Sequence, residues 1–157
     1  MTLRDGYTMA VEQGHENHEE LIPLYKTHYA EMQSRLAAAG TPIGDYNPQY
    51  ERYFAAFRSG FLVNFVLRFH GKPVGYSNIY VMPDMHSSEL VAREDTIYVL
   101  PEHRNGCGKE LAKYVIQGLR NVGVKRFTIT TATDLRSGIV WKRMGFKPVA
   151  ECLVYTF

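Results

Sequence analysis

The segment that most constrains this chain lies at residues 99–109 and reads VLPEHRNGCGK. A β-branched and aromatic run ends at Pro101, two glycines follow, and a helical pattern begins at Lys109. A strand that enters a helix through a glycine turn forms an anion site, because glycines expose backbone N–H groups and the helix N-terminus carries a partial positive charge. Arg104 and Lys109 bring formal charge to the same place. The segment therefore predicts a phosphate-bearing, nucleotide-like ligand near the middle of the chain.

Length and composition narrow the class of protein. The chain has 157 residues, of which 45% are hydrophobic and 22% charged, and this fits one globular domain over residues 1–157. No apolar run approaches the roughly 20 residues of a membrane helix. The first residues lack an apolar signal core, so a cytoplasmic location is expected. The two cysteines are too few for a disulfide framework.

Charge is unevenly distributed along the chain. Residues 1–92 carry a formal charge of −3 and residues 93–157 carry +5. A basic second half suits an anionic cofactor, and an acidic first half suits a cationic substrate. Ordinary variation in a solvated surface is the competing interpretation of this split.

Hydrophobic periodicity and turn residues predict the order of elements. We expect one strand, two helices, a run of three strands, and then helix, strand, helix and strand, with a tight hairpin at residues 70–72. The predicted strands are 7–12, 61–69, 73–81, 90–100, 127–132 and 149–156, and the predicted helices are 19–38, 49–58, 109–122 and 135–144. This order indicates an α/β (α+β) fold with a mixed sheet flanked by helices.

With these features the chain resembles the GNAT-type, acyl-CoA-dependent N-acetyltransferases. The segment 101–108 resembles the pyrophosphate loop of that family, and Trp141-Lys142-Arg143-Met144-Gly145-Phe146 resembles the aromatic-x-x-x-Gly-Phe end of its last helix. The element order matches over nearly the whole chain, and the sequence is similar to small phage and bacterial members. The resemblance implies a mostly antiparallel sheet in which two parallel strands splay apart and form the cleft for CoA.

The resemblance also implies acetyl-CoA as cofactor and assigns its contacts. The pantetheine arm would pair with Ile97, Tyr98 and Val99, and the Val99 N–H would stabilise the developing oxyanion. Either His103 or Arg104 fills the first position of the loop, and Asp134 lies where the family contacts the cofactor arm. Trp141 is expected either to touch that arm or to pack its helix against the sheet. The pyrophosphate would lie on the loop residues, which are Arg104, Asn105, Gly106, Cys107, Gly108 and Lys109.

Acetyl transfer to an amine needs a group that removes a proton, because alkylamines are mostly protonated at pH 7. Glu94 and Asp95 lie just upstream of the thioester-facing backbone, and strand alternation places them on opposite faces. We favour Glu94 as the base, because Thr96 and Tyr98 would share its face; a surface position for both acids is the competing interpretation. His86, in the loop before the cofactor strand, is a second candidate for substrate binding or proton relay, although a solvated loop histidine is the more common case.

The leaving thiolate has no obvious proton donor. Trp141 stands where the family often has a tyrosine, and its indole N–H is not acidic. Tyr98, Tyr80, Tyr155 or a water could replace that tyrosine, and a thiol pKa of about 8.5 also permits unassisted departure. Cys107 is not expected to act as a nucleophile, because this family transfers the acyl group directly.

The leading hypothesis is therefore an N-acetyltransferase that acts on a primary amine of a small molecule or a protein. The alternative is a GNAT-fold protein that binds CoA or a partner and has lost efficient catalysis. A nucleic-acid-binding role is disfavoured because the basic residues lack a base-reading motif and net charge is only +2. No metal site is expected, membrane association is not expected, and the sequence leaves a homodimer open.

Overall fold

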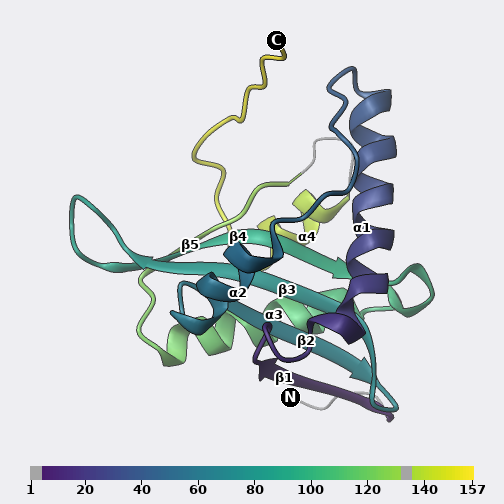
Figure 1. The fold of residues 1–157 in the computed structure, drawn as a ribbon. Coiled ribbons are helices and arrows are strands. Elements are labelled where there is room, and N and C mark those ends of the chain that lie inside the picture. Colours follow the sequence, from purple (N-terminus) through teal and green to yellow (C-terminus); the bar gives the residue numbers. More distant parts are fainter. Residues whose placement is uncertain (1–4, 132–135) are drawn as a thin grey trace.

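The structure is a computed structural model and describes residues 5–131 and 136–157. The helices and strands follow the predicted order closely up to the last helix (Figure 1). The elements are β1 (Tyr7–Glu12), α1 (His18–Ala38), α2 (Tyr50–Arg58), β2 (Leu62–Phe69), β3 (Lys72–Pro83), β4 (Leu90–Val99), the 3-10 turn η1 (Pro101–His103), α3 (Cys107–Asn121), β5 (Arg126–Thr128) and α4 (Ser137–Arg143).

The strands form a single mixed sheet in the order β1-β2-β3-β4-β5. Neighbours are antiparallel from β1 to β4, and β4 pairs with β5 in parallel from Val91↔Arg126 to Arg93↔Thr128. The mixed, mostly antiparallel sheet that the sequence predicts is therefore confirmed. The β2–β3 hairpin is also confirmed, with φ angles of 47° at His70 and 81° at Gly71 that suit a two-residue turn with positive φ at both positions.

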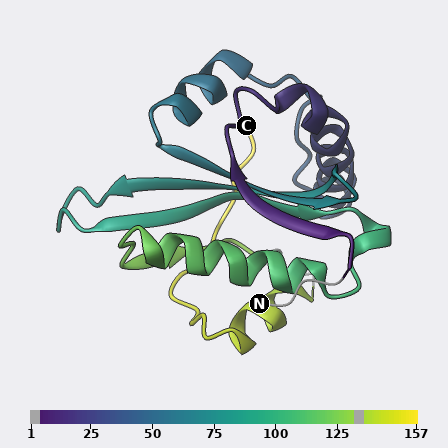
Figure 2. The same cartoon turned by 90° about the horizontal axis from the view of Figure 1, so that it is seen from below.

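Helices cover both faces of the sheet. In Figure 2, α1 and α2 lie on one side, and α3 and α4 lie on the other. The α3 side holds the larger core, which includes Phe65, Leu67, Ile79, Leu111 and Val115. The α1 side holds a smaller cluster of Leu21, Leu24, Val66, Tyr76 and Tyr98. In the ranges that the structure describes, no helix has the length and apolar content needed to cross a membrane.

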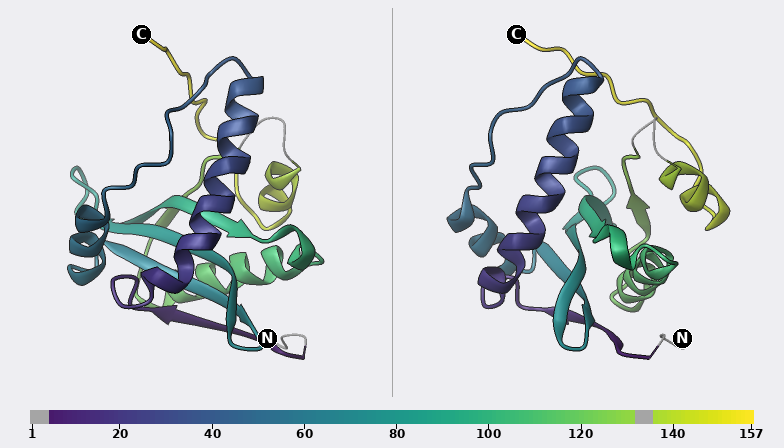
Figure 3. Two further views of the ribbon diagram at one scale, coloured as in Figure 1. Left: turned by 45° about the vertical axis from the view of Figure 1, so that its right-hand side comes forward. Right: turned by 90° about the vertical axis from the view of Figure 1, so that its right-hand side faces the viewer.

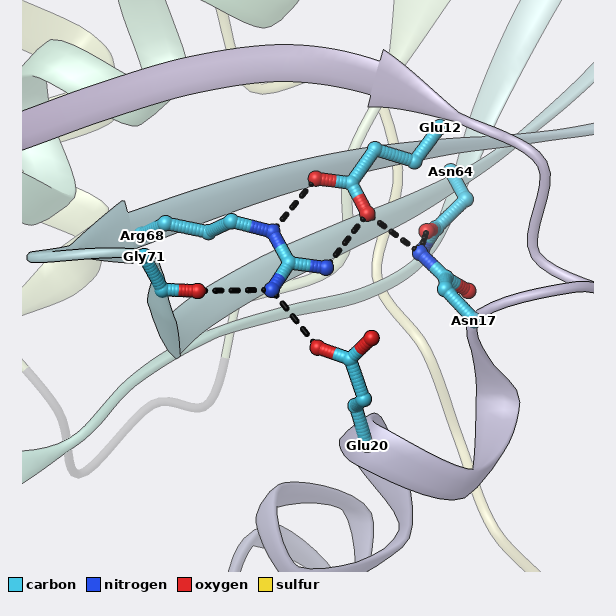
Figure 4. A network of polar contacts seen from close by, with 6 residues as sticks. All are labelled: Glu12, Asn17, Glu20, Asn64, Arg68 and Gly71. Atoms are coloured by element: carbon cyan, nitrogen blue, oxygen red, sulfur yellow. Dashed lines mark hydrogen bonds and ion pairs between the residues drawn. The ribbon is translucent and has the colours of Figure 1, made fainter.

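An ionic network fixes the start of α1 against the sheet. The Arg68 guanidinium on β2 donates to both carboxylate oxygens of Glu12 on β1, at 2.7 and 2.8 Å, and to Glu20 of α1 at 2.7 Å (Figure 4). Asn17, just before α1, donates to Glu12 at 2.6 Å and to Asn64 at 3.3 Å. The hydrogen bond that Glu12 accepts from Arg68 holds the pKa of Glu12 below its ordinary value, although partial burial opposes the shift. The long helix α1 is thereby set across the sheet, as Figure 3 shows.

The prediction of a final strand at residues 149–156 is wrong. The structure describes these residues and assigns them no strand, and their apolar side chains are exposed, with 88% of Leu153 and 80% of Tyr155 accessible. The pattern alternates as in a strand, but a strand also needs a neighbour for its backbone groups. In Figure 1 this segment runs away from the sheet. β5 is also shorter than the predicted strand at 127–132, since it ends at Thr128.

Candidate active site

The loop between β4 and α3 presents free backbone N–H groups. The chain reaches Gly106 with a φ of 105°, in the left-handed region that favours glycine, and α3 then begins without a side-chain cap. In the part of the chain that the structure describes, the N–H groups of Asn105, Cys107 and Gly108 donate no hydrogen bond. A Cβ at Gly108 would meet no atom within 4 Å. The helix start is therefore open, and its donors suit an anion.

One edge of β4 is free beside this loop. Among the described residues the β4–β5 ladder ends at Arg93↔Thr128, so the second half of β4 has β3 as its ladder partner. The Leu100 N–H donates to the Val74 carbonyl at 2.9 Å. In an antiparallel pair every second residue bonds the same neighbour, so the peptide groups of Ile97 and Val99 point to the free edge. The predicted pairing with an extended ligand thus has donors at these two residues, while the Tyr98 peptide bonds β3.

The Arg104 side chain turns toward α1. Its Nε donates to the Val99 carbonyl at 2.8 Å, its Nη2 contacts Glu31 Oε2 at 2.8 Å, and its guanidinium lies 5.2 Å from the centre of the Tyr98 ring. The charge of Arg104 is therefore paired with Glu31 in this structure. A direct contact between Arg104 and phosphate stays a prediction.

A basic cavity lies next to the loop. Its volume is about 390 Å³, and it is lined by α3 and the end of α4. Lys109 lies in the first turn of α3 and also lines this cavity. The cavity is therefore adjacent to the free N–H groups. Four of its lining residues are cationic, so the cavity suits an anionic group. The lining residues are Lys109, Lys113, Ile116, Gln117, Arg120, Arg143 and Met144.

Three other residues assigned to the cofactor have different surroundings. Trp141 is buried in α4, its ring 5.0 Å from that of Phe146, which in turn contacts Phe127 of β5. This chain of rings attaches α4 to the sheet, so Trp141 has a packing role. Cys107 is buried at the helix start, and its thiol lies 3.6 Å from the Asn105 side-chain oxygen. Asp134 lies outside the described residues.

A β-bulge at Glu94 and Asp95 overturns the argument that favoured Glu94. Ile79 pairs with Glu94 and Asn78 with Thr96, so Asp95 is the extra residue. A bulge interrupts the alternation of side chains. Glu94 thus shares the α3-side face with Ile79, and its carboxylate accepts a hydrogen bond from the Thr130 N–H at 3.2 Å. Burial raises the pKa of Glu94, and this hydrogen bond opposes the rise.

Asp95 faces the other side of the sheet, which α1 and α2 cover. Its negative charge acts on the hydroxyls of Tyr25, Tyr53 and Tyr80, which come from α1, α2 and β3. Burial raises the pKa of Asp95, and a hydrogen bond from Tyr80 opposes the rise. Tyr98 is on this face too, since it pairs with Tyr76. The bulge therefore makes Asp95, and not Glu94, the acid that shares a face with Tyr98.

Two residues of α1 complete this face, and sequence reasoning missed both. His28 stacks on Tyr98 with ring centres 4.6 Å apart, and its Nδ1 lies 2.7 Å from the Tyr76 hydroxyl. Burial lowers the pKa of His28 to about 4, so the imidazole is neutral at pH 7. The Tyr98 hydroxyl donates to Glu31 at 2.5 Å, and burial together with this bond raises the pKa of Tyr98 to about 12. The spacing of residues along a helix does not distinguish functional side chains from core side chains, so the sequence did not single out His28 and Glu31.

His86 lies apart from the other candidates. It is exposed in the β3–β4 hairpin, where its N–H donates to Asp84 at 3.0 Å. The hairpin is at the start of β4, whereas the glycine loop follows its end, and Figure 1 shows the hairpin extending beyond the sheet. A strand of ten residues at roughly 3.3 Å per residue separates the two. His86, proposed from the sequence for substrate binding or proton relay, is therefore separated from the glycine loop by the length of β4.

Comparison with known proteins identifies the family. The model of the acetyltransferase (GNAT) family matches residues 17–146, which is most of the chain. A search of curated protein sequences found no match.

Solved structures share the fold at low sequence identity. An aminoglycoside acetyltransferase, meta-AAC0020, from an uncultured soil metagenomic sample has 18% identity and a TM-score of 0.71 over 99% of this chain and 97% of that chain. The ribosomal-protein-alanine N-acetyltransferase from Brucella melitensis biovar Abortus 2308 has 16% identity and a TM-score of 0.69 over 96% and 99%. The glucosamine-6-phosphate N-acetyltransferase from Arabidopsis thaliana has 11% identity and a TM-score of 0.68 over 96% and 98%. These acceptors differ, so the likeness establishes the fold alone.

Proposed function

The chain belongs to the GNAT acetyltransferase family, and from this premise we propose that it transfers an acetyl group from acetyl-CoA to a primary amine by direct attack. The observation that carries the proposal is the continuity of donors from the free edge of β4 into the uncapped start of α3. Ile97 and Val99 supply strand-like donors, and the loop supplies free N–H groups a few residues later. An extended chain that ends in a pyrophosphate needs this arrangement.

Acetyl-CoA fits the residues present. Its pyrophosphate would lie on the N–H groups of Asn105, Cys107 and Gly108, where open space around Gly108 leaves room. The cationic residues of the adjoining cavity add attraction for the phosphates. The arm would run along β4, and the Val99 N–H would face the thioester carbonyl and stabilise the charge that develops there.

Asp95 is the base that the arrangement favours. The amine must be neutral to attack the carbonyl carbon, and Asp95 accepts its proton directly or through a water. The nitrogen then forms the C–N bond, the C–S bond breaks with its electron pair leaving on the thiolate of CoA, and the second proton that the nitrogen must lose passes to solvent. Glu94 lies on the opposite face and accepts the Thr130 N–H, so it holds the β4–β5 junction instead.

The thiolate leaves without a protein acid in this proposal. The indole of Trp141 is not acidic, and the Tyr98 hydroxyl donates to Glu31. A tyrosine pKa of about 12 also makes Tyr98 a weak acid toward a thiolate whose conjugate acid has a pKa of about 8.5. A thiolate with that pKa departs and is protonated by solvent.

Continuous measurement of thiol release from acetyl-CoA, across a panel of primary amines, tests the proposed function. We expect amine-dependent release above the rate of hydrolysis, with the acetylated amine visible by mass spectrometry. The competing function, a GNAT-fold protein that binds CoA without catalysis, predicts thermal stabilisation by CoA with no amine-dependent release. That second outcome would refute acetyl transfer and leave the cofactor site in place.

A further inference from the structure

A group of tyrosines lies on the face covered by α1 and α2, and the charge of Asp95 acts on four of them. We call it the tyrosine cluster; its rings are half-buried except that of Tyr76, which is buried. The members come from α1, the segment before α2, α2 itself and β3. They are Tyr25, Tyr46, Tyr50, Tyr53, Tyr76 and Tyr80.

Direct contacts and shared electrostatics hold the cluster together. The rings of Tyr25 and Tyr76 meet edge to face with centres 4.7 Å apart, and the hydroxyls of Tyr46 and Tyr50 lie 3.2 Å apart. Burial raises the pKa of the cluster tyrosines Tyr25, Tyr46, Tyr53, Tyr76 and Tyr80, so their hydroxyls are neutral at pH 7. The cluster therefore presents neutral aromatic rings and hydroxyls beside one carboxylate.

Three buried polar atoms beside the tyrosine rings make no hydrogen bond of normal geometry. In residues 5–131 and 136–157 they are Tyr25 Oη, Asp95 Oδ2 and Thr96 Oγ1, whose neighbours Asn78, Tyr80 and Tyr76 satisfy them only loosely. A buried polar atom without a partner is costly, and a native protein rarely keeps three of them together. A ligand with N–H donors would satisfy the carboxylate oxygen and the hydroxyls at once.

The charge on this face allows one ammonium group. Asp95 is the acid whose charge acts on Tyr25, Tyr53, Tyr76 and Tyr80. Glu31 is neutralised by Arg104 at 2.8 Å. Arg93 pairs with Tyr80 across the β3–β4 ladder, so a positive charge flanks the cluster and would repel a second ammonium.

We propose that the acceptor is a primary amine with a single positive charge on a flat apolar body, with its ammonium at Asp95 and its body against the tyrosine rings. Cations bind the faces of aromatic rings, and a carboxylate at the centre adds a charge-assisted hydrogen bond. The inference rests on the proposed acetyl transfer and adds the substrate class. It ranks polyamines and aminoglycosides below such amines, because Asp95 is the acid whose charge acts on the cluster tyrosines and Arg93 lies across the ladder from Tyr80.

Two measurements test the inference. The first compares kcat/KM for phenethylamine, spermidine and kanamycin, and we expect phenethylamine to exceed both polycations by at least about tenfold, from one ring contact and one unmatched charge. The second measures binding of phenethyltrimethylammonium by calorimetry. This cation cannot be acetylated, so its binding reports on the cluster independently of transfer.

Variants assign the binding to the cluster. Tyr53→Leu should weaken binding of phenethyltrimethylammonium by about tenfold, whereas Tyr53→Phe should keep most of it, because the ring face carries the interaction. Asp95→Asn should weaken it by at least a similar factor. Tyr114→Leu is the matched control, because Tyr114 lies on α3 against Phe65, on the other side of the sheet. The Tyr114→Leu variant should bind phenethyltrimethylammonium as tightly as the parent does.

The outcomes separate the two proposals. Faster acetylation of spermidine or kanamycin than of phenethylamine would overturn the substrate class and leave acetyl transfer intact. Equal binding of the quaternary cation by the parent, Tyr53→Leu and Asp95→Asn would also overturn it. Absence of transfer to every amine, with cluster-dependent binding of the quaternary cation, would refute the proposed function and support the cation site.

Discussion

The two faces of the sheet differ in chemistry. Toward α3 the buried side chains are mainly aliphatic, with Phe65, Leu67, Ile79 and Leu111 at its centre. Toward α1 and α2 the face carries tyrosines, His28, Asp95 and the amides of Asn64 and Asn78, which share a hydrogen bond of 2.7 Å. One face buries apolar area, and the other holds groups whose protonation and hydrogen bonds are available for chemistry. The larger apolar core and the candidate catalytic groups thus lie on opposite sides of the same strands.

The largest expected effect is on the aliphatic face. Phe65 is 2% exposed and contacts Tyr114 of α3. Phe65→Ala should lower the free energy of unfolding by about 3–5 kcal/mol through lost burial and the cavity left behind. Denaturant titration measures the change. Phe157→Ala, at a fully exposed phenylalanine, is the matched control, and similar losses in both variants would contradict the assignment of the core.

On the opposite face, the ionic network should make stability depend on pH. The pKa of Glu12 is lowered in the folded protein, so Glu12 contributes stability above its unfolded pKa of about 4.3 and that contribution is lost as pH falls through the folded value. We expect the free energy of unfolding to fall as pH drops below about 4.3, and Glu12→Gln to lower it at pH 7 and flatten this dependence. An unchanged slope in Glu12→Gln would show that Arg68 does not act through Glu12.

A smaller effect is expected where α1 meets the glycine loop. The side chains of Arg104 and Glu31 are 48% and 42% exposed, so solvent screens their ion pair. Glu31→Gln should cost less than about 1 kcal/mol of unfolding free energy, and added salt should reduce the difference from the parent. A loss that salt leaves unchanged would mean that the hydrogen bond to Tyr98, and not the ion pair, is the stabilising contact.

The smallest effect is expected at Cys107. Cys107→Ala should keep most of kcat, because direct transfer needs no enzyme nucleophile and the backbone N–H at this position is unchanged. Steady-state thiol release compares the two proteins. An acetyl group found on Cys107 by mass spectrometry after incubation with acetyl-CoA would contradict direct transfer.

Sequence reasoning located the fold because the local signals were strong. The helical spacing of α3, the glycine loop and the His70-Gly71 turn each depend on neighbours in sequence. The strand predicted at 149–156 failed for the opposite reason. Alternating apolar and polar residues show that a segment could form a half-buried strand, but they do not show that a neighbouring strand is there to pair with it. Val149 and Tyr155 accordingly lie exposed in a segment without regular secondary structure.

The site was predicted in part. The loop donors follow from glycine and helix chemistry, which are local. The face of Asp95 was not predictable, because two adjacent acids carry no apolar pattern that would reveal a bulge at Asp95, opposite Asn78 and Ile79. His28 and Glu31 join the site through contacts with Tyr98, 67 residues away from Glu31 in sequence, and only the packing of α1 on the sheet brings them together.

The central claim is that the face toward α1 and α2 performs proton removal, and the pH–rate profile of Asp95→Asn tests it most directly. A lost base should lower kcat/KM by about 10²–10⁴-fold, and the defect should shrink as pH rises toward the pKa of the amine, with CoA affinity unchanged. Since burial raises the pKa of Asp95, removing its charge should leave the folded protein equally or more stable at pH 7. Glu94→Gln is measured beside it. A normal profile for Asp95→Asn with a crippled Glu94→Gln would place the base on the α3 side and contradict the account.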